Sequence, residues 1–192
     1  MALLDLSNIS YVVKDKAIIR DISLAIHEGD YMTIVGPSGS GKSTLLKLCS
    51  DLISPTSGYI TYNGCDLTSI DPENYRKEVG YCFQRPYLFA KTVRRNILFP
   101  YDIRGMKPDM ERIQYLFDLL HMSMEYLERR NDELSGGEMQ RICLIRSLIF
   151  EPKVLLLDEV TSALDSVNIS IVEEVIDELH NKGMTIVSIT HR

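Results

Sequence analysis

The sequence predicts an α/β fold in which helices cover both faces of a largely parallel sheet. Two segments, residues 154–157 and 184–189, have continuous rather than alternating apolar character, as is typical of strands buried on both faces. A third strand pattern, at 31–35, leads through a glycine-rich turn into a helical pattern at 42–50. Between about residues 85 and 150 the apolar period becomes helical, so we expect a helical insert in the α/β core.

The remaining elements follow from alternation and from turn residues. Apolar residues alternate at 9–13 and 17–26, which predicts half-buried strands. Gly58 and the pair Asn63-Gly64 mark turns around another strand pair near 59–62. We expect strands at 9–13, 17–26, 31–35, 59–62, 154–158 and 184–189. We expect helices at 42–50, 110–120 and about 168–180, the last of which ends in an Asn-Lys-Gly cap.

Length and composition limit the class of protein. At roughly 150 residues per domain, 192 residues correspond to a single domain. The 45% of hydrophobic and 25% of charged residues are typical of a globular fold and exclude a disordered chain or a collagen-like fibre. The net charge of −6 argues against a protein that binds nucleic acid.

The same composition predicts a soluble, cytoplasmic chain. No apolar run approaches the roughly 18 residues of a membrane span, and the N-terminus lacks the basic segment of a secretory signal. Four scattered cysteines form no C-x-x-C pair. We therefore expect buried or free thiols rather than disulfides or a zinc site.

A phosphate-binding loop lies between the strand at 31–35 and the following helix. Residues 36–43 match G-x-x-x-x-G-K-[ST] in full. The glycines allow successive backbone N–H groups to converge on an anion at a helix N-terminus. Lys42 supplies a charge for the β- and γ-phosphates, and Ser43 a hydroxyl for Mg²⁺. A loop that merely turns the chain would not need this complete pattern. The predicted nucleotide-binding residues are Gly36, Pro37, Ser38, Gly39, Ser40, Gly41, Lys42, Ser43 and Thr44.

Two acidic residues follow the buried strand at 154–157. Asp158 is expected at the carboxyl edge of the sheet, where it can hold Mg²⁺ through its water shell. Glu159 can orient or deprotonate an attacking water. An apolar strand followed by two acids also occurs by chance, but the complete phosphate loop favours the functional interpretation.

A second anion site is indicated at residues 134–141, Leu-Ser-Gly-Gly-Glu-Met-Gln-Arg. Ser135 and Glu138 form a capping-box pattern, so a helix is expected to start here and run toward Phe150. Gly136 and Gly137 lower helix propensity, so their presence at a helix start indicates another role for them. Small residues at a helix N-terminus leave amide groups accessible to an anion.

With these motifs in this order, the chain resembles the ATP-binding cassette (ABC) family, whose signature is L-S-G-G-[QE]. The resemblance covers essentially the whole chain. It implies a P-loop NTPase (RecA-like) core with an antiparallel β subdomain and an inserted α-helical subdomain. On this basis residues 1–84 and 152–192 form the core with its β subdomain, and residues 85–151 form the helical subdomain that carries the signature.

The resemblance also implies roles for individual residues. Glu159, His191 and Gln84 are the expected catalytic residues, and Ser43, Gln84 and Asp158 the expected ligands of Mg²⁺. Tyr11 resembles the aromatic residue that stacks on adenine. Residues 162–165 resemble a loop that crosses between subunits. The further nucleotide contacts, made across a dimer, are Ser135, Gly136, Gly137, Glu138 and Asp165.

The family mechanism requires a second copy of the chain and a membrane partner. Two cassettes sandwich two ATP molecules head to tail, and an integral membrane permease holds them at the cytoplasmic face of the cell membrane. Residues 85–112 contain seven basic and three acidic residues in an otherwise acidic chain. Together with the aromatics of 86–89 they indicate a docking surface for the permease. A solvated helical face is the alternative.

Other members of the family are soluble. Chromosome and repair ATPases insert a long coiled coil before the signature, which this chain lacks, and translation factors carry two cassettes. An iron–sulfur assembly ATPase remains the open alternative to a transporter. A small-molecule kinase would have no use for the signature at 134–138.

Within the transporters, several short runs resemble a small bacterial subfamily linked to iron export. Family members usually continue beyond the histidine at position 191 with a further strand and helix. We therefore expect ATP binding but weak hydrolysis by this chain alone.

Overall fold

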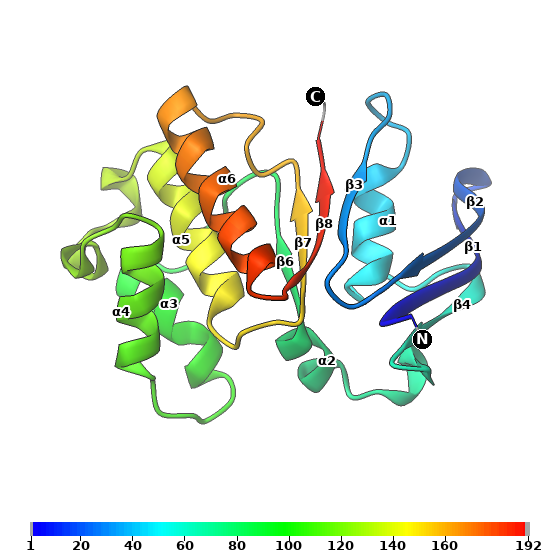
Figure 1. Cartoon of the computed structure of the whole chain (residues 1–192), viewed down its shortest axis with the longest axis horizontal. Coiled ribbons are helices and arrows are strands. Elements are labelled where there is room, and N and C mark those ends of the chain that lie inside the picture. The colour runs from blue at the N-terminus through cyan, green and yellow to red at the C-terminus, as the bar shows by residue number, and fades with distance from the viewer. Residues whose placement is uncertain (1, 191–192) are drawn as a thin grey trace.

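Two four-stranded sheets organise the protein (Figure 1); the computed structural model describes residues 2–190. The antiparallel sheet has the order β2-β1-β4-β5, and the parallel sheet the order β3-β8-β7-β6. The strands of the first are β1 (Leu4–Val13), β2 (Lys16–Ile26), β4 (Ser57–Tyr62) and β5 (Cys65–Asp66). Those of the second are β3 (Tyr31–Ile34), β6 (Val79–Cys82), β7 (Val154–Asp158) and β8 (Thr185–Ile189).

The parallel sheet separates two hydrophobic cores. Helix α1 (Lys42–Cys49) lies between this sheet and the antiparallel sheet, whereas α5 (Gly136–Leu148) and α6 (Ser166–Asn181) cover its other face (Figure 1). Along β7, Leu155 and Leu157 pack with α5 and α6, and Val154 and Leu156 pack with α1 and the antiparallel strands. All five residues of β7 are buried. This confirms the prediction of a sheet covered on both faces.

Residues 93–148 contain the helical insert. Helices α3 (Val93–Asp102), α4 (Met110–Leu119) and α5 pack around buried apolar side chains such as Ile97 and Phe117. The same core continues into α6 and the face of the parallel sheet that α5 covers. The insert is therefore packed directly onto the α/β core, and α5 contacts both the other helices of the insert and the parallel sheet.

Two neighbouring elements have no counterpart among the predicted ones. Helix α2 (Pro72–Glu78) and strand β6 follow one another without a turn. β6 has only four residues, one of them Gly80, so the window is too short for a periodicity to be seen. A Cβ at Gly80 would lie 3.0 Å from the Ser147 carbonyl oxygen of α5, so this glycine lets the helix pack against the strand.

Two predictions about side chains and spans can be compared directly with the structure. Cys49, Cys82 and Cys143 are buried, Cys65 is exposed, and all four are free thiols, as expected. Among residues 2–190, no helix has the length and apolar character that a membrane crossing requires.

Candidate functional site

The phosphate loop connects β3 to α1, as the sequence predicts. Gly41 immediately precedes α1 with φ of +96°, and a Cβ there would lie 2.9 Å from the carbonyl oxygen of Ile18. Glycine is therefore required at this position on both conformational and steric grounds. Within the described part of the chain no side chain caps α1. Its first N–H groups therefore face the loop, where they can bind an anion.

Lys42 places its charge over this loop. The residue is only 8% exposed, and Nζ donates hydrogen bonds to the carbonyl oxygens of Gly36 at 2.9 Å and Pro37 at 3.1 Å. Both partners are neutral, so an anion that enters the loop gains the full attraction of a partly desolvated ammonium group.

Asp158 joins three elements at the end of β7. Its Oδ1 accepts a hydrogen bond from Ser43 Oγ in α1, and its Oδ2 accepts one from the Tyr81 hydroxyl in β6, both at 2.8 Å. The carboxylate is 4% exposed, so these two hydroxyls satisfy a buried charge. Burial raises the pKa of Tyr81, and its hydrogen bond to Asp158 raises that pKa further, so the phenol remains a donor.

The neighbouring carboxylate belongs to Glu159. Its Oε2 accepts a 2.6 Å hydrogen bond from Gln84 Nε2, and its backbone has φ of +49°, an uncommon conformation for a residue other than glycine. Residues held in such conformations cluster at functional sites. The geometry places an amide and a second carboxylate directly beside the phosphate loop.

These groups surround one cavity of about 320 Å³. It is lined by Ile18, Ser38, Gly39, Gly41, Lys42, Ser43, Thr44, Gln84 and Glu159. The hydroxyl of Ser43, the carboxylate of Asp158 and the amide oxygen of Gln84 are hard oxygen donors of the type that Mg²⁺ prefers. The site therefore combines an anion cradle with a donor set that fits a magnesium ion.

The second predicted anion site lies at the start of α5. Ser135 Oγ accepts a hydrogen bond from the Glu138 amide, and Glu138 Oε2 accepts one from the Ser135 amide, which confirms the predicted capping box. Tyr126 adds a 2.5 Å hydrogen bond to Glu138 that the sequence did not indicate. None of the described residues 135–138 lines the phosphate-loop cavity.

The two glycines of α5 have different surroundings. A Cβ at Gly137 would lie 2.4 Å from Cγ of Asn168, in the first turn of α6, so this glycine permits contact between the two helices. A Cβ at Gly136 would meet nothing within 4 Å. Packing therefore explains Gly137, whereas Gly136 leaves an open surface at the helix N-terminus.

Asp165 caps α6 within its own chain. Its carboxylate accepts hydrogen bonds from the amide of Asn168 at 2.9 Å and from the Asn168 side chain at 2.7 Å. These bonds lower the pKa of Asp165. Asn168 therefore connects the cap of α6 to Gly137 of α5, a contact that the spacing of the motifs did not reveal.

Two further predicted residues are Tyr11 and His191. Tyr11 is on β1, paired with Ile19, and is not among the residues that line the phosphate-loop cavity, although Ile18 is. His191 lies outside the described residues 2–190.

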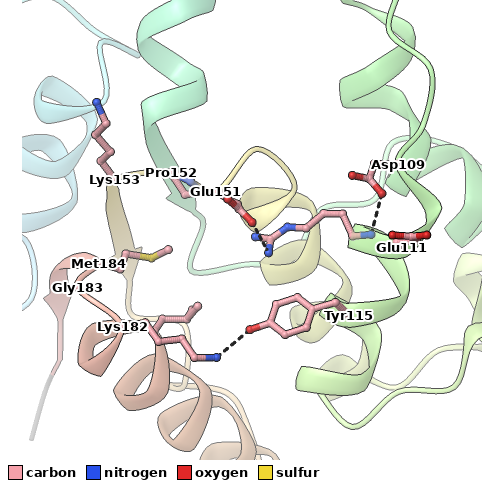
Figure 2. Close-up of a pocket in the computed structure, with 11 residues that line it drawn as sticks. Asp109, Glu111, Tyr115, Glu151, Pro152, Lys153, Lys182, Gly183 and Met184 are labelled. Carbon is pink, nitrogen blue, oxygen red and sulfur yellow. Dashed lines mark hydrogen bonds and ion pairs between the residues drawn. The ribbon is translucent and has the colours of Figure 1, made fainter.

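A larger cavity, of about 670 Å³, lies elsewhere among the described residues (Figure 2). It lies where residues 152–153 enter β7 and residues 183–184 enter β8, at the opposite end of the sheet from Asp158. Among its charged lining groups, Arg112 pairs with Glu151 at 2.8 Å, and the Lys182 ammonium donates to the Tyr115 hydroxyl at 3.0 Å. Ligands of open α/β sheets bind at the carboxyl edge of the sheet, so the cavity beside the phosphate loop is the candidate site.

Comparison with known proteins gives a consistent result. The family model described as "ABC transporter" matches residues 19–162. The chain is 44% identical to the "Probable iron export ATP-binding protein FetA" of Escherichia coli, over 98% of this chain and 84% of that protein. It is 38% identical to the "Phosphate import ATP-binding protein PstB" of Saccharolobus solfataricus, over 97% and 77%.

The fold is also similar to that of solved structures. A post-hydrolysis dimer of the ATP-binding cassette MJ0796, bound to ADP and Pi, superposes with a TM-score of 0.87. The sequence identity is 28%, over 98% of this chain and 88% of that one.

We expect the two glycines of α5 to respond differently to alanine. Gly137→Ala must displace the Asn168 side chain and its bond to Asp165, at a cost of about 1–2 kcal/mol. Gly136→Ala has open space and gains up to about 1 kcal/mol of helix propensity. Urea unfolding of both variants measures the difference, and equal stabilities would contradict the packing account. Asn168→Ala should reduce the cost of Gly137→Ala.

Proposed function

The chain belongs to the ATP-binding cassette (ABC) transporter family, and we propose on this premise that it is the ATP-hydrolysing subunit of a membrane transporter. Its substrate is ATP, with Mg²⁺ as the associated metal. The observation that supports this most strongly is the convergence of the phosphate loop, Asp158, Glu159 and Gln84 at one edge of the parallel sheet.

In this proposal the chain's own groups bind the triphosphate. The backbone amides of residues 36–44 and the ammonium of Lys42 bind the β- and γ-phosphates, and Tyr11 stacks on the adenine. Ser43, Asp158 and Gln84 hold Mg²⁺, which neutralises phosphate charge when bound. The neutral partners of Lys42 and the oxygen donors around Asp158 support this assignment.

Glu159 acts on the attacking water. As a carboxylate beside the phosphate loop it can orient that water and accept its proton. The 2.6 Å bond from Gln84 supports a resting arrangement in which the amide holds the carboxylate in place. The contact with the γ-phosphate is assigned to His191 from its place in the sequence.

The complete site requires a second copy of the chain, arranged head to tail. Ser135, Gly136, Gly137 and Glu138 of one copy face the γ-phosphate bound by the other, together with Asp165. The open surface at Gly136 supports this, because a phosphate can approach the first turn of α5 without meeting a side chain there. Structural similarity to dimeric cassettes supports the same arrangement.

The domain organisation follows from these roles. Residues 1–84 and 152–192 constitute the catalytic core with its β subdomain. Residues 85–151 constitute the helical subdomain that carries the signature. The position of α5, packed against β6 and α3, supports a mechanical connection between these two parts.

A groove between the two parts is the proposed docking site for the permease. This cavity of about 310 Å³ lies among α2, β6, α3 and α5. Its apolar lining includes Phe83, Phe89, Phe99 and Ile103, and its basic lining includes Arg76, Lys77, Arg104 and Arg146. An amphipathic segment with acidic residues fits such a groove. Docking there places the subunit at the cytoplasmic face of the membrane.

Only part of the basic stretch at 85–112 contributes to this surface. Arg112 pairs with Glu151 and donates to the carbonyl oxygen of Leu148, so it joins α4 to α5 and the residues that follow it. Arg104 lines the groove, and its guanidinium lies 4.8 Å from the centre of the Phe150 ring. The docking surface also uses basic residues of α2 and α5, outside the stretch that the sequence indicated.

Iron export is the transport activity that we assign. The identity of 44% to FetA exceeds that of 38% to PstB, which supports export of iron over import of phosphate. Because the cargo crosses through the permease, this assignment rests on the sequence relatives and not on residues of this chain.

Replacement of the proposed base should separate binding from turnover. We expect Glu159→Gln to keep ATP affinity within about twofold, to slow hydrolysis by about 10²–10⁴-fold, and to accumulate an ATP-bound dimer. Calorimetry, phosphate release and size-exclusion chromatography measure the three quantities. Glu174→Gln, at an exposed position of α6, is the matched control. Hydrolysis at the wild-type rate would refute the role of Glu159.

A charge placed in the groove should weaken permease binding. Ile103 is 55% exposed and lines the groove. We expect Ile103→Asp to lower the amount of permease that co-purifies from detergent-extracted membranes by at least about tenfold, as for a hot-spot residue, with ATP binding unchanged. Leu52→Asp, exposed but away from the groove, is the control. Equal recovery with both variants, or recovery of soluble assembly proteins instead, would contradict the docking site.

The cargo can be tested in the host cell. Loss of the gene should raise cellular iron, measured by mass spectrometry, and the wild-type gene but not Lys42→Ala should restore it. Unchanged iron together with reduced phosphate uptake would favour phosphate import and reject the assigned cargo.

A further inference from the structure

We propose that Tyr81 is a positioning residue for Asp158 and connects this carboxylate to the docking groove. The inference rests on the proposed function, because it concerns how the metal-binding carboxylate is held. Tyr81 lies three residues before Gln84. Its approach to Asp158 follows from the register of β6 beside β7, in which it pairs with Leu156.

Each carboxylate oxygen of Asp158 accepts a hydrogen bond from a different element. Ser43 and Tyr81 approach different oxygens of the carboxylate, each at 2.8 Å, from α1 and β6 on either side of β7. Two donors on two oxygens fix the rotation of a carboxylate, whereas one donor leaves it free to turn. Ser43 is itself a proposed metal ligand, so Tyr81 is the partner that can hold Asp158 while the metal binds.

The Tyr81 side chain contacts both the docking groove and Asp158. Its ring lines the docking groove, and its centroid lies 4.6 Å from that of Phe83, which is 44% exposed in the same groove. Its hydroxyl contacts Asp158 on the opposite side. A partner that presses on Phe83 therefore acts on the orientation of Asp158 through a single rigid side chain.

Tyr81 and Gln84 contact different carboxylates of the site. Gln84 contacts Glu159, and Tyr81 contacts Asp158, so two residues near the groove hold two different carboxylates. The backbone of Tyr81 is fixed as well, because Ser147 of α5 donates to its carbonyl oxygen at 3.1 Å. Docking at the groove can therefore act on Asp158 through Tyr81 without passing through Glu159.

The test compares the variants Tyr81→Phe and Tyr62→Phe of the full chain. The Tyr62 hydroxyl donates to Glu78 at 2.6 Å, so its loss removes a similar tyrosine–carboxylate bond far from the nucleotide. ATP affinity is measured by calorimetry with Mg²⁺ and with EDTA. We expect Tyr81→Phe to weaken the Mg²⁺-dependent affinity by about tenfold, as for outer-shell partners of metal ligands, and to leave metal-free affinity within about twofold.

The outcomes are distinguishable. Unchanged Mg²⁺ dependence in Tyr81→Phe, or the same loss in Tyr62→Phe, overturns the role of Tyr81 while the proposed function stands. Absence of Mg²⁺-dependent ATP binding in the wild type would instead reject the proposed function. In the permease complex, Tyr81→Phe should also reduce the stimulation of hydrolysis by the permease, and unchanged stimulation would refute the connection to the groove.

Discussion

The structure depends on strand β7, which must be buried on both faces and yet end in a charge. Its apolar residues alternate between two hydrophobic cores, so the strand fixes how the helical insert and the antiparallel sheet sit on opposite sides of it. Its last residue, Asp158, is 4% exposed and can exist there only because hydroxyl donors from α1 and β6 meet it. The contact with Ser43 also holds the start of α1, and with it the phosphate loop, at the carboxyl edge of the sheet. The contacts that allow β7 to fold with a buried charge at its end are therefore the same contacts that assemble the site.

The helical insert is coupled to this edge through α5. Its N-terminus presents Gly136 to solvent, its middle supplies Gln140, which donates to the carbonyl oxygen of Phe83 at 3.2 Å, and its end contacts β6 through Ser147. One rigid helix thus spans from the open anion site to the residues just before Gln84. A shift of α5 cannot leave the Gln84 segment unchanged, because a buried amide and a hydroxyl hold the two together.

The sequence could predict those parts of the site that rest on local physics. The phosphate loop needs closely spaced glycines, here at 36, 39 and 41, and the capping box needs Ser135 and Glu138 three residues apart, so both are visible in a short window. Tyr81, Asn168 and Tyr126 could not be predicted, because each meets its partner through strand register or helix packing between distant segments. Strand β6 and helix α2 were missed for a related reason, since four and seven residues are too few to establish a period.

The separation of the two anion sites within one chain has a mechanistic consequence. The start of α5 does not line the phosphate-loop cavity, so the two proposed anion sites are separate within one copy. In the proposed head-to-tail dimer, a twofold axis places each α5 against the loop of the other copy with the same surfaces. In this arrangement the phosphate brings negative charge to two helix N-termini, and hydrolysis removes that charge and its stabilisation of the dimer. Because α5 also borders the proposed docking groove, we expect opening and closing of this dimer to act on the partner bound there.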